Sequence, residues 1–189
     1  MISSLKKIVV ATAAASSLLA TAANAADIYQ GGVVVPSVSG VTFYGSNIQL
    51  TKGAVNLNCN LSLDGDIAPD GSGGANIQVT GGSVTGAGFC GLVNLTNFPW
   101  TAHVDAADAP VPPANTLVPV TFNGITVQAS FLGTCGPGPV TAMYNNGASV
   151  PNTDASSFDF AASLNPGNCS ITGKLSTQMP YSTEDVDVY

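Results

Sequence analysis

Hydrophobic and polar residues alternate with a period of two along much of this chain. The clearest run spans residues 55–63, where every odd position is apolar or cysteine and every even position is polar. Residues 125–131 and 169–175 repeat the pattern. Successive side chains of a β-strand point to opposite faces, so each run predicts a strand with one buried and one solvated face. Cys59 and Cys169 fall on the predicted buried faces, where a disulfide would join core strands.

Turn-forming residues separate the apolar runs. Asn123-Gly124 lies between two of them, and such a pair favours a type I′ hairpin turn because both residues adopt positive φ. Further turns or loops are expected at Gly81-Gly82, Asn146-Gly147, residues 64–74 and residues 105–114. About nine or ten short strands joined in this way are typical of a sandwich or a barrel. We favour an all-β fold, a single-domain antiparallel β-sandwich.

The first 25 residues have the features of a signal peptide. Lys6 and Lys7 precede an apolar stretch over residues 8–20, and Ala23-Asn24-Ala25 then supplies the small residues that signal peptidase requires. Residues 1–25 are therefore expected to direct export through the general secretory pathway and to be removed. The apolar stretch is shorter than the ~20 residues of a membrane-spanning helix, so no transmembrane segment is expected after cleavage.

The remainder of the chain divides into three predicted parts. Residues 26–45 form an N-terminal arm or edge strand, because Gly31-Gly32 and Pro36 interrupt the alternation there. Residues 46–181 form the β-sandwich domain. Residues 182–189 form an acidic C-terminal tail, which we expect to be exposed.

The charge balance excludes some classes of partner. Residues 26–189 contain Lys52 and Lys174, no arginine and all 11 acidic residues, so their formal charge is 2 − 11 = −9. Nucleic acids and anionic lipid surfaces are bound by clusters of lysine and arginine. We therefore expect no nucleic-acid partner.

The four cysteines predict two disulfides. Cys59, Cys90, Cys135 and Cys169 all follow the predicted signal peptide, and an even number of cysteines in an exported protein indicates disulfide bonds. Three pairings are possible, and we favour Cys59–Cys90 with Cys135–Cys169, which joins chain neighbours. With one histidine and no CxxC pair, a zinc site is not expected.

Residues with catalytic or metal-binding chemistry are few. His103 lies two residues before Asp105, but no GxSxG motif supplies a nucleophile, so we interpret the pair as a surface histidine beside a turn aspartate. Asp64, Asp66 and Asp70 have the alternating spacing of calcium ligands, but turn-favouring aspartates explain them as well. We assign no catalytic residue, no metal ligand and no cofactor, and we expect that the protein is not an enzyme.

Phe98-Pro99-Trp100 contains the only tryptophan of the chain. A large aromatic side chain beside a rigid proline is a candidate apolar contact for a ligand. The alternative, which we favour, is that Trp100 anchors the core at the start of a strand.

Three segments together resemble a known family. They are residues 97–101 (NFPWT), Cys135-Gly136-Pro137 leading to residues 144–146 (YNN), and residues 168–175 (NCSITGKL). These segments are similar to the secreted bacterial activators of alkane oxidation of the PraB type, and the similarity covers residues 55–180. The resemblance implies a secreted accessory protein that promotes contact with, or use of, hydrophobic substrates such as long-chain alkanes. It brings no catalytic residue with it.

Two other functions remain open. Exported sandwiches rich in threonine, valine, alanine, asparagine and glycine suit assembly by β-strand addition, which would make the chain a subunit of an extracellular fibre or biofilm matrix. Residues 26–40 would then be the donor strand. A hydrolase is the least favoured alternative. The expected partners are therefore apolar compounds or copies of the same chain, outside the cell or on its outer surface.

Overall fold

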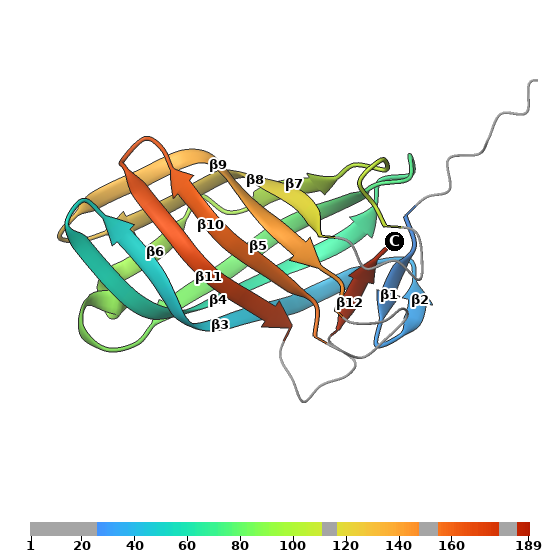
Figure 1. The fold of residues 1–189 in the computed structure, drawn as a ribbon, viewed down its shortest axis with the longest axis horizontal. Coiled ribbons are helices and arrows are strands. Elements are labelled where there is room, and N and C mark those ends of the chain that lie inside the picture. Colours follow the sequence, from blue (N-terminus) through green and yellow to red (C-terminus); the bar gives the residue numbers. More distant parts are fainter. Residues whose placement is uncertain (1–25, 111–116, 148–154, 178–184) are drawn as a thin grey trace, which may run out of the picture.

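The computed structural model describes residues 26–110, 117–147, 155–177 and 185–189. In these ranges the chain forms two antiparallel sheets and one short 3-10 helix, η1 (Gly88–Leu92) (Figure 1). No helix in the same ranges has the length and the apolar composition that crossing a bilayer requires. The small sheet contains β1 (Ile28–Gln30), β2 (Val33–Val35) and β12 (Val186–Val188). The large sheet contains β3 (Val38–Lys52), β4 (Val55–Pro69), β5 (Ala75–Thr85), β6 (Val93–Thr96), β7 (Trp100–Val104), β8 (Val118–Ala129), β9 (Gly133–Asn145), β10 (Ser157–Leu164) and β11 (Cys169–Thr177).

The large sheet closes on itself as an eight-stranded antiparallel barrel. Its strand order is β8-β7-β5-β4-β3-β11-β10-β9, and β9 then pairs with β8, while β6 pairs with β8 beyond the end of β7. The closing ladder runs from Val118 opposite Tyr144 to Ala129 opposite Gly133. The all-β antiparallel prediction is confirmed, but the prediction of a β-sandwich is wrong. Both folds bury alternate residues of each strand, and the unbroken ring of strand pairings, which includes both β7–β8 and β8–β9, distinguishes the barrel.

Two of the predicted hairpin turns lie inside continuous strands. Asn123-Gly124 is in the middle of β8, and Gly81-Gly82 is in β5. At each place the ladder with the neighbouring strand shifts register, between Phe122 and Ile125 on β8 and between Asp64 and Gly65 on β4 opposite β5. Glycine supports a bulge as well as a turn, because both require unusual backbone angles; Gly124 has a φ of +79°. The bulges bend the long strands as a barrel demands.

The aspartates predicted to lie in a loop over residues 64–74 are divided between a strand and a turn. Asp64 and Asp66 belong to β4, which continues to Pro69, and the turn to β5 is confined to residues 70–74. Asp70 holds this turn, because its Oδ1 accepts hydrogen bonds from the backbone N–H of Ser72 (2.7 Å) and of Gly74 (2.9 Å). The sequence pattern placed the turn correctly but made it too long.

An aromatic cluster fills the half of the barrel interior that adjoins the small sheet. Phe158 on β10 is its centre, with ring centroids 4.8 Å from Phe43 on β3, 5.2 Å from Phe122 on β8 and 4.8 Å from Tyr144 on β9. All four side chains are buried. Because they come from four strands around the barrel, they hold its walls together and separate its two ends.

The small sheet covers one end of the barrel, next to the C-terminus (Figure 1). β1 lies between β12 and β2, with Ile28 opposite both Val188 and Val35. The N-terminal arm is thus paired with the C-terminus of its own chain. β3 starts at Val38 and runs across the predicted boundary between residues 45 and 46.

The prediction of an exposed C-terminal tail is wrong for residues 185–189. Asp185 and Asp187 are each 1 % exposed, and Val186 and Val188 are equally buried. The side chain of Asn146 donates to the carbonyl of Val188 (2.8 Å) and accepts from its N–H (2.9 Å). The acidic composition suggested solvation, but the alternating valines form a strand that pairs with β1.

Tyr144 links the barrel wall to this C-terminal strand. Its hydroxyl donates a hydrogen bond to the backbone carbonyl of Val186, and both groups are buried. Burial raises the pKa of Tyr144 well above the ordinary value, so the hydroxyl keeps the proton that it donates.

We predict that Tyr144→Phe lowers the free energy of unfolding by about 1 kcal/mol, because a buried carbonyl loses its hydroxyl donor. Urea unfolding followed by circular dichroism measures the change. Tyr44→Phe is the matched control, since Tyr44 is 36 % exposed on β3. Equal unfolding midpoints for the two variants would contradict the role assigned to Tyr144.

Candidate binding cavity

The half of the barrel away from the small sheet contains a cavity of about 90 Å³. Its wall is almost entirely apolar and includes leucines of β4 and branched residues of β8. The polar residues in the lining are at strand ends: Thr51 and Lys52 at the end of β3, and Ser170 near the start of β11. An eight-stranded barrel is just wide enough to be filled by side chains or to hold one small ligand. Here the aromatic cluster fills one half and leaves the cavity in the other.

Trp100 forms part of the cavity wall. Its side chain is 3 % exposed, and its indole N–H donates a hydrogen bond to the carbonyl of Thr96 (2.9 Å). The ring of Phe98 stacks against it with a centroid distance of 4.6 Å, while Pro99 is exposed. Trp100 is therefore a core anchor, as favoured from the sequence, and of the three residues of the motif it alone lines the cavity. A role of Phe98, Pro99 and Trp100 in ligand contact stays a prediction.

Both disulfides are at the cavity end of the barrel. Cys59 of β4 is bonded to Cys90 of η1, and Cys135 of β9 is bonded to Cys169 of β11, with Cα–Cα distances of 5.6 and 6.0 Å. This is the pairing favoured from the sequence, and it is confirmed. Cys135 and Cys169 also line the cavity. The second disulfide therefore forms part of the cavity wall.

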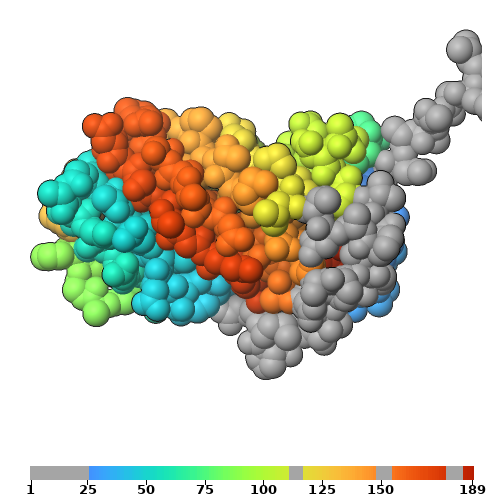
Figure 2. Space-filling model, in the orientation of Figure 1, coloured from blue at the N-terminus to red at the C-terminus, as the bar shows by residue number. Residues whose placement is uncertain are grey.

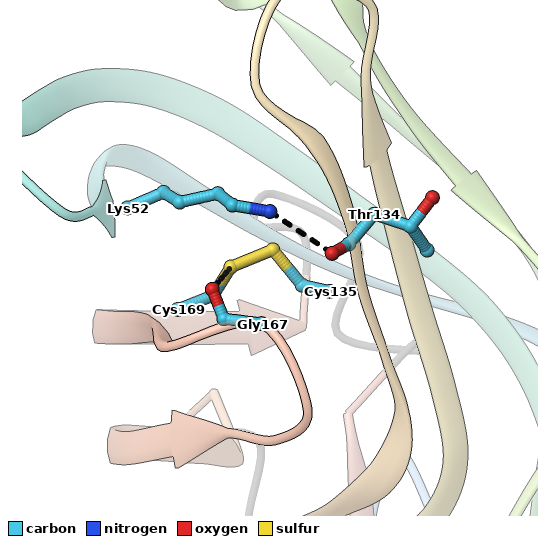
Figure 3. Close-up of a disulfide and its surroundings, with 5 residues drawn as sticks. All are labelled: Lys52, Thr134, Cys135, Gly167 and Cys169. Carbon is cyan, nitrogen blue, oxygen red and sulfur yellow. Dashed lines mark hydrogen bonds between the residues drawn. A yellow bond between two sulfur atoms is a disulfide. The ribbon is translucent and has the colours of Figure 1, made fainter.

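Lys52 extends across the same region. Its Nζ donates a hydrogen bond to the backbone carbonyl of Thr134, 2.9 Å away on β9. In Figure 3 its side chain passes beside the Cys135–Cys169 disulfide to reach Thr134. Because β3 and β9 are separated in the sheet by β11 and β10, this contact crosses the end of the barrel.

Exposed apolar side chains surround this end. Phe89 and Leu92 of η1 are 55 % and 43 % exposed, and Phe131, in the turn between β8 and β9, is 40 % exposed. The rings of Phe89 and Phe131 are 4.7 Å apart. We call these three residues the apolar rim. Figure 2 shows the η1 segment, in light green, at the surface of the left-hand end.

Sequence reasoning missed the apolar rim. The alternation over residues 125–131 placed Phe131 on a buried face, but β8 ends at Ala129 and the turn carries Phe131 outward. The neighbouring Leu132 lines the cavity instead. The only local sign that β8 ends before Phe131 is Ser130, and a single serine is weak evidence for a strand end.

A model of the family described as alkane oxidation protein activator PraA/PraB-like matches residues 2–183, nearly the whole chain. The chain belongs to this family. The resemblance drawn from the three sequence segments is thereby confirmed. No curated protein and no solved structure matches the chain.

The only histidine of the chain, His103, is exposed on the barrel strand β7, beside acidic side chains. His103 Nε2 is 3.3 Å from Asp70 Oδ2 and 3.5 Å from Asp105 Oδ1, and its Nδ1 is 3.2 Å from Asn76 Oδ1. A polar groove of about 400 Å³ adjoins it, and the described residues that line the groove include no serine or cysteine. His103 is exposed and Asp105 directly follows β7, which is the arrangement of a surface histidine beside a turn aspartate.

The aspartates considered as calcium ligands accept hydrogen bonds from backbone N–H groups and from neighbouring hydroxyls. Asp64 Oδ1 accepts from the hydroxyl of Thr42 (2.6 Å), and Asp66 Oδ1 accepts from the N–H of Gly40 (2.9 Å). Hydrogen bonds from Ser72 lower the pKa of Asp70. Across the described part of the chain, no three His, Cys, Asp or Glu side chains are grouped to hold a metal ion.

We predict that replacing both Cys135 and Cys169 by alanine lowers the free energy of unfolding by about 3–4 kcal/mol, because the disulfide closes a loop and so reduces the conformational freedom of the unfolded chain. The bonded cysteines are 34 residues apart, and Cys59 and Cys90 are 31 apart, so the corresponding second double variant should lose a similar amount. Urea unfolding of both variants measures the losses. An unfolding curve that is insensitive to either change would contradict a stabilising role.

Proposed function

We propose that this protein is an exported, non-enzymatic accessory protein that binds alkyl chains of hydrophobic compounds, such as long-chain alkanes, and so promotes their use by the cell. The observation that carries the proposal is the apolar cavity inside the closed barrel. The description of the family as activators of alkane oxidation supports the same assignment.

The cavity size indicates what part of an alkane would enter. An engineered apolar cavity of ~150 Å³ binds benzene, so a cavity of about 90 Å³ suits a short alkyl segment rather than a whole long chain. Burial contributes about 0.8 kcal/mol per methylene group, and about four methylenes would give roughly 3 kcal/mol. Such a segment alone binds weakly, so the rest of the chain must find contacts elsewhere.

The apolar rim is suited to provide those contacts. Phe89, Leu92 and Phe131 expose apolar surface at the end of the barrel that contains the cavity. An exposed apolar patch is unfavourable in water and commonly marks a binding surface. An alkane would thus place one end in the cavity and lay the adjoining segment against the rim.

Export and an extracellular site of action fit the covalent structure. Structural disulfides such as these two are typical of oxidising compartments, and residues 1–25, which lie outside the described residues, have the sequence of a signal peptide. The proposed site of action is therefore the outer cell surface or the medium, where alkanes first meet the cell.

We predict that hexyl bromide quenches the fluorescence of Trp100 in a saturable way, because bromine quenches an indole that it contacts and Trp100 lines the cavity. The protein contains no other tryptophan, so the signal reports this site alone. Ala129→Leu fills the cavity from β8 and should abolish saturable quenching.

Ala161→Leu is the matched control for this titration, since Ala161 is exposed on β10 and the same side chain is added. Thermal unfolding identifies any variant that fails to fold. Should Ala129→Leu not fold, Leu57→Phe occupies the cavity from β4. Quenching that rises linearly, and equally in wild type and both filled variants, would overturn the proposal.

A second function, self-assembly into a fibre or matrix, is favoured by one observation. β2 is an edge strand of the small sheet, and its Val33 and Val34 are 64 % and 54 % exposed. Exposed apolar edge strands pair with other chains. The donor-strand form of this idea is less favoured, because β1 is already paired with β12 of its own chain and Ile28 is fully buried.

Edge-to-edge assembly predicts that Val34→Lys abolishes filaments or large oligomers seen by size-exclusion chromatography and electron microscopy, since an edge lysine opposes pairing. Leu117→Lys is the control, because Leu117 is 54 % exposed outside the small sheet. If the wild type and both variants are monomeric at high concentration, the proposal of self-assembly is wrong.

A further inference from the structure

Lys52 is a cation at the end of an otherwise apolar cavity. Residues 26–189 contain two lysines and no arginine, and Lys52 is the one placed at this end of the barrel. Among the described residues that line the cavity, it alone has a charged side chain. It is half-buried and lies opposite Cys169 in the β3–β11 ladder.

The ammonium group of Lys52 lacks an acidic partner within the described ranges. The close acid–base contacts there both involve His103, and Lys52 bonds instead to the neutral carbonyl of Thr134. A lysine ammonium has three N–H donors, and this carbonyl accepts one of them. In a protein whose residues 26–189 carry a formal charge of 2 − 11 = −9, a cation without an acidic partner beside a cavity is suited to an anionic ligand.

A saturated hydrocarbon makes no use of this group, since it has no hydrogen-bond acceptor. A carboxylate at the end of an alkyl chain would accept from Lys52 Nζ, because the ammonium has further N–H donors beside the one given to Thr134. Terminal oxidation of an alkane leads through the alcohol to this carboxylate. The chemistry of the cavity therefore matches the oxidised product better than the alkane itself.

We propose that the ligand class of this cavity is the alkyl carboxylates, with the headgroup held by Lys52 and a short segment of the alkyl chain among the apolar residues of the cavity. This inference rests on the proposed function and specifies its ligand. It places the protein after the oxidation of an alkane chain, as a carrier or sensor of the acid formed.

The test is competition against hexyl bromide, followed by recovery of Trp100 fluorescence in the intact protein. Octanoate, octanol and octyl phosphate are the competitors, because they share one chain length and differ in headgroup. Octanoate should displace the bromide at an about tenfold lower concentration than octanol, because a charge-assisted hydrogen bond is added. High salt should weaken octanoate and leave octanol unchanged.

Lys52→Met should remove the preference for octanoate over octanol, whereas Lys52→Arg should keep it. Lys174→Met is the matched control, since Lys174 is exposed on β11 and the same charge is lost. Thermal unfolding separates a loss of ligand preference from a loss of the Lys52–Thr134 contact, which would lower stability without changing the order of the competitors.

The outcomes distinguish the two proposals. Saturable quenching with equal competition by octanoate and octanol, or a preference that survives in Lys52→Met, would overturn the carboxylate assignment and leave alkyl binding standing. Stronger competition by octyl phosphate than by octanoate would assign the site to phosphate headgroups and equally overturn it. No saturable quenching by hexyl bromide would remove both proposals.

Discussion

The pairing of β8 with β9 is the contact on which the rest of this structure depends. It joins the two ends of a long antiparallel sheet, from Val118 opposite Tyr144 to Ala129 opposite Gly133. Without it, the apolar faces of the eight strands would form an open surface that needs a second layer to cover it. With it, those faces enclose an interior, and the cavity, both disulfides and the apolar rim lie inside that interior or at one of its ends.

Different interactions stabilise the two ends of the barrel. At one end, noncovalent contacts close the interior: the small sheet of β12, β1 and β2, the hydroxyl of Tyr144 and the side-chain amide of Asn146. At the other end, two disulfides and the Lys52–Thr134 contact hold the strands around a cavity that side chains do not fill. The aromatic cluster around Phe158 lies between them. A covalently fixed wall around an unfilled apolar space suits the reception of a ligand, because the space persists when it is empty.

Much of the local structure follows from the alternation of residues, and the errors have identifiable physical causes. The strand over residues 55–63 and the cysteine pairing are as predicted. Asn123-Gly124 formed a bulge rather than a turn, because both structures place glycine at positive φ and the choice depends on whether β9 continues alongside. The C-terminal Asp185 and Asp187 were expected in water, yet the valines between and after them pair with β1 and bring the aspartates inside. In each case a contact with a distant segment overrode a sound local preference.

The sequence by itself determined that the protein is an all-β chain with two disulfides and few positive charges. It also determined the family to which the chain belongs. These properties depend on residue type and on neighbours along the chain, which a pattern of two-residue period records directly. Only the tertiary structure decided that the sheet closes, that a cavity remains beside Trp100, and that Lys52 reaches Thr134 next to the Cys135–Cys169 disulfide. Alternation states which face of a strand is buried, but not which strands are neighbours. The candidate site is made of residues from at least six strands, and their meeting depends on that pairing.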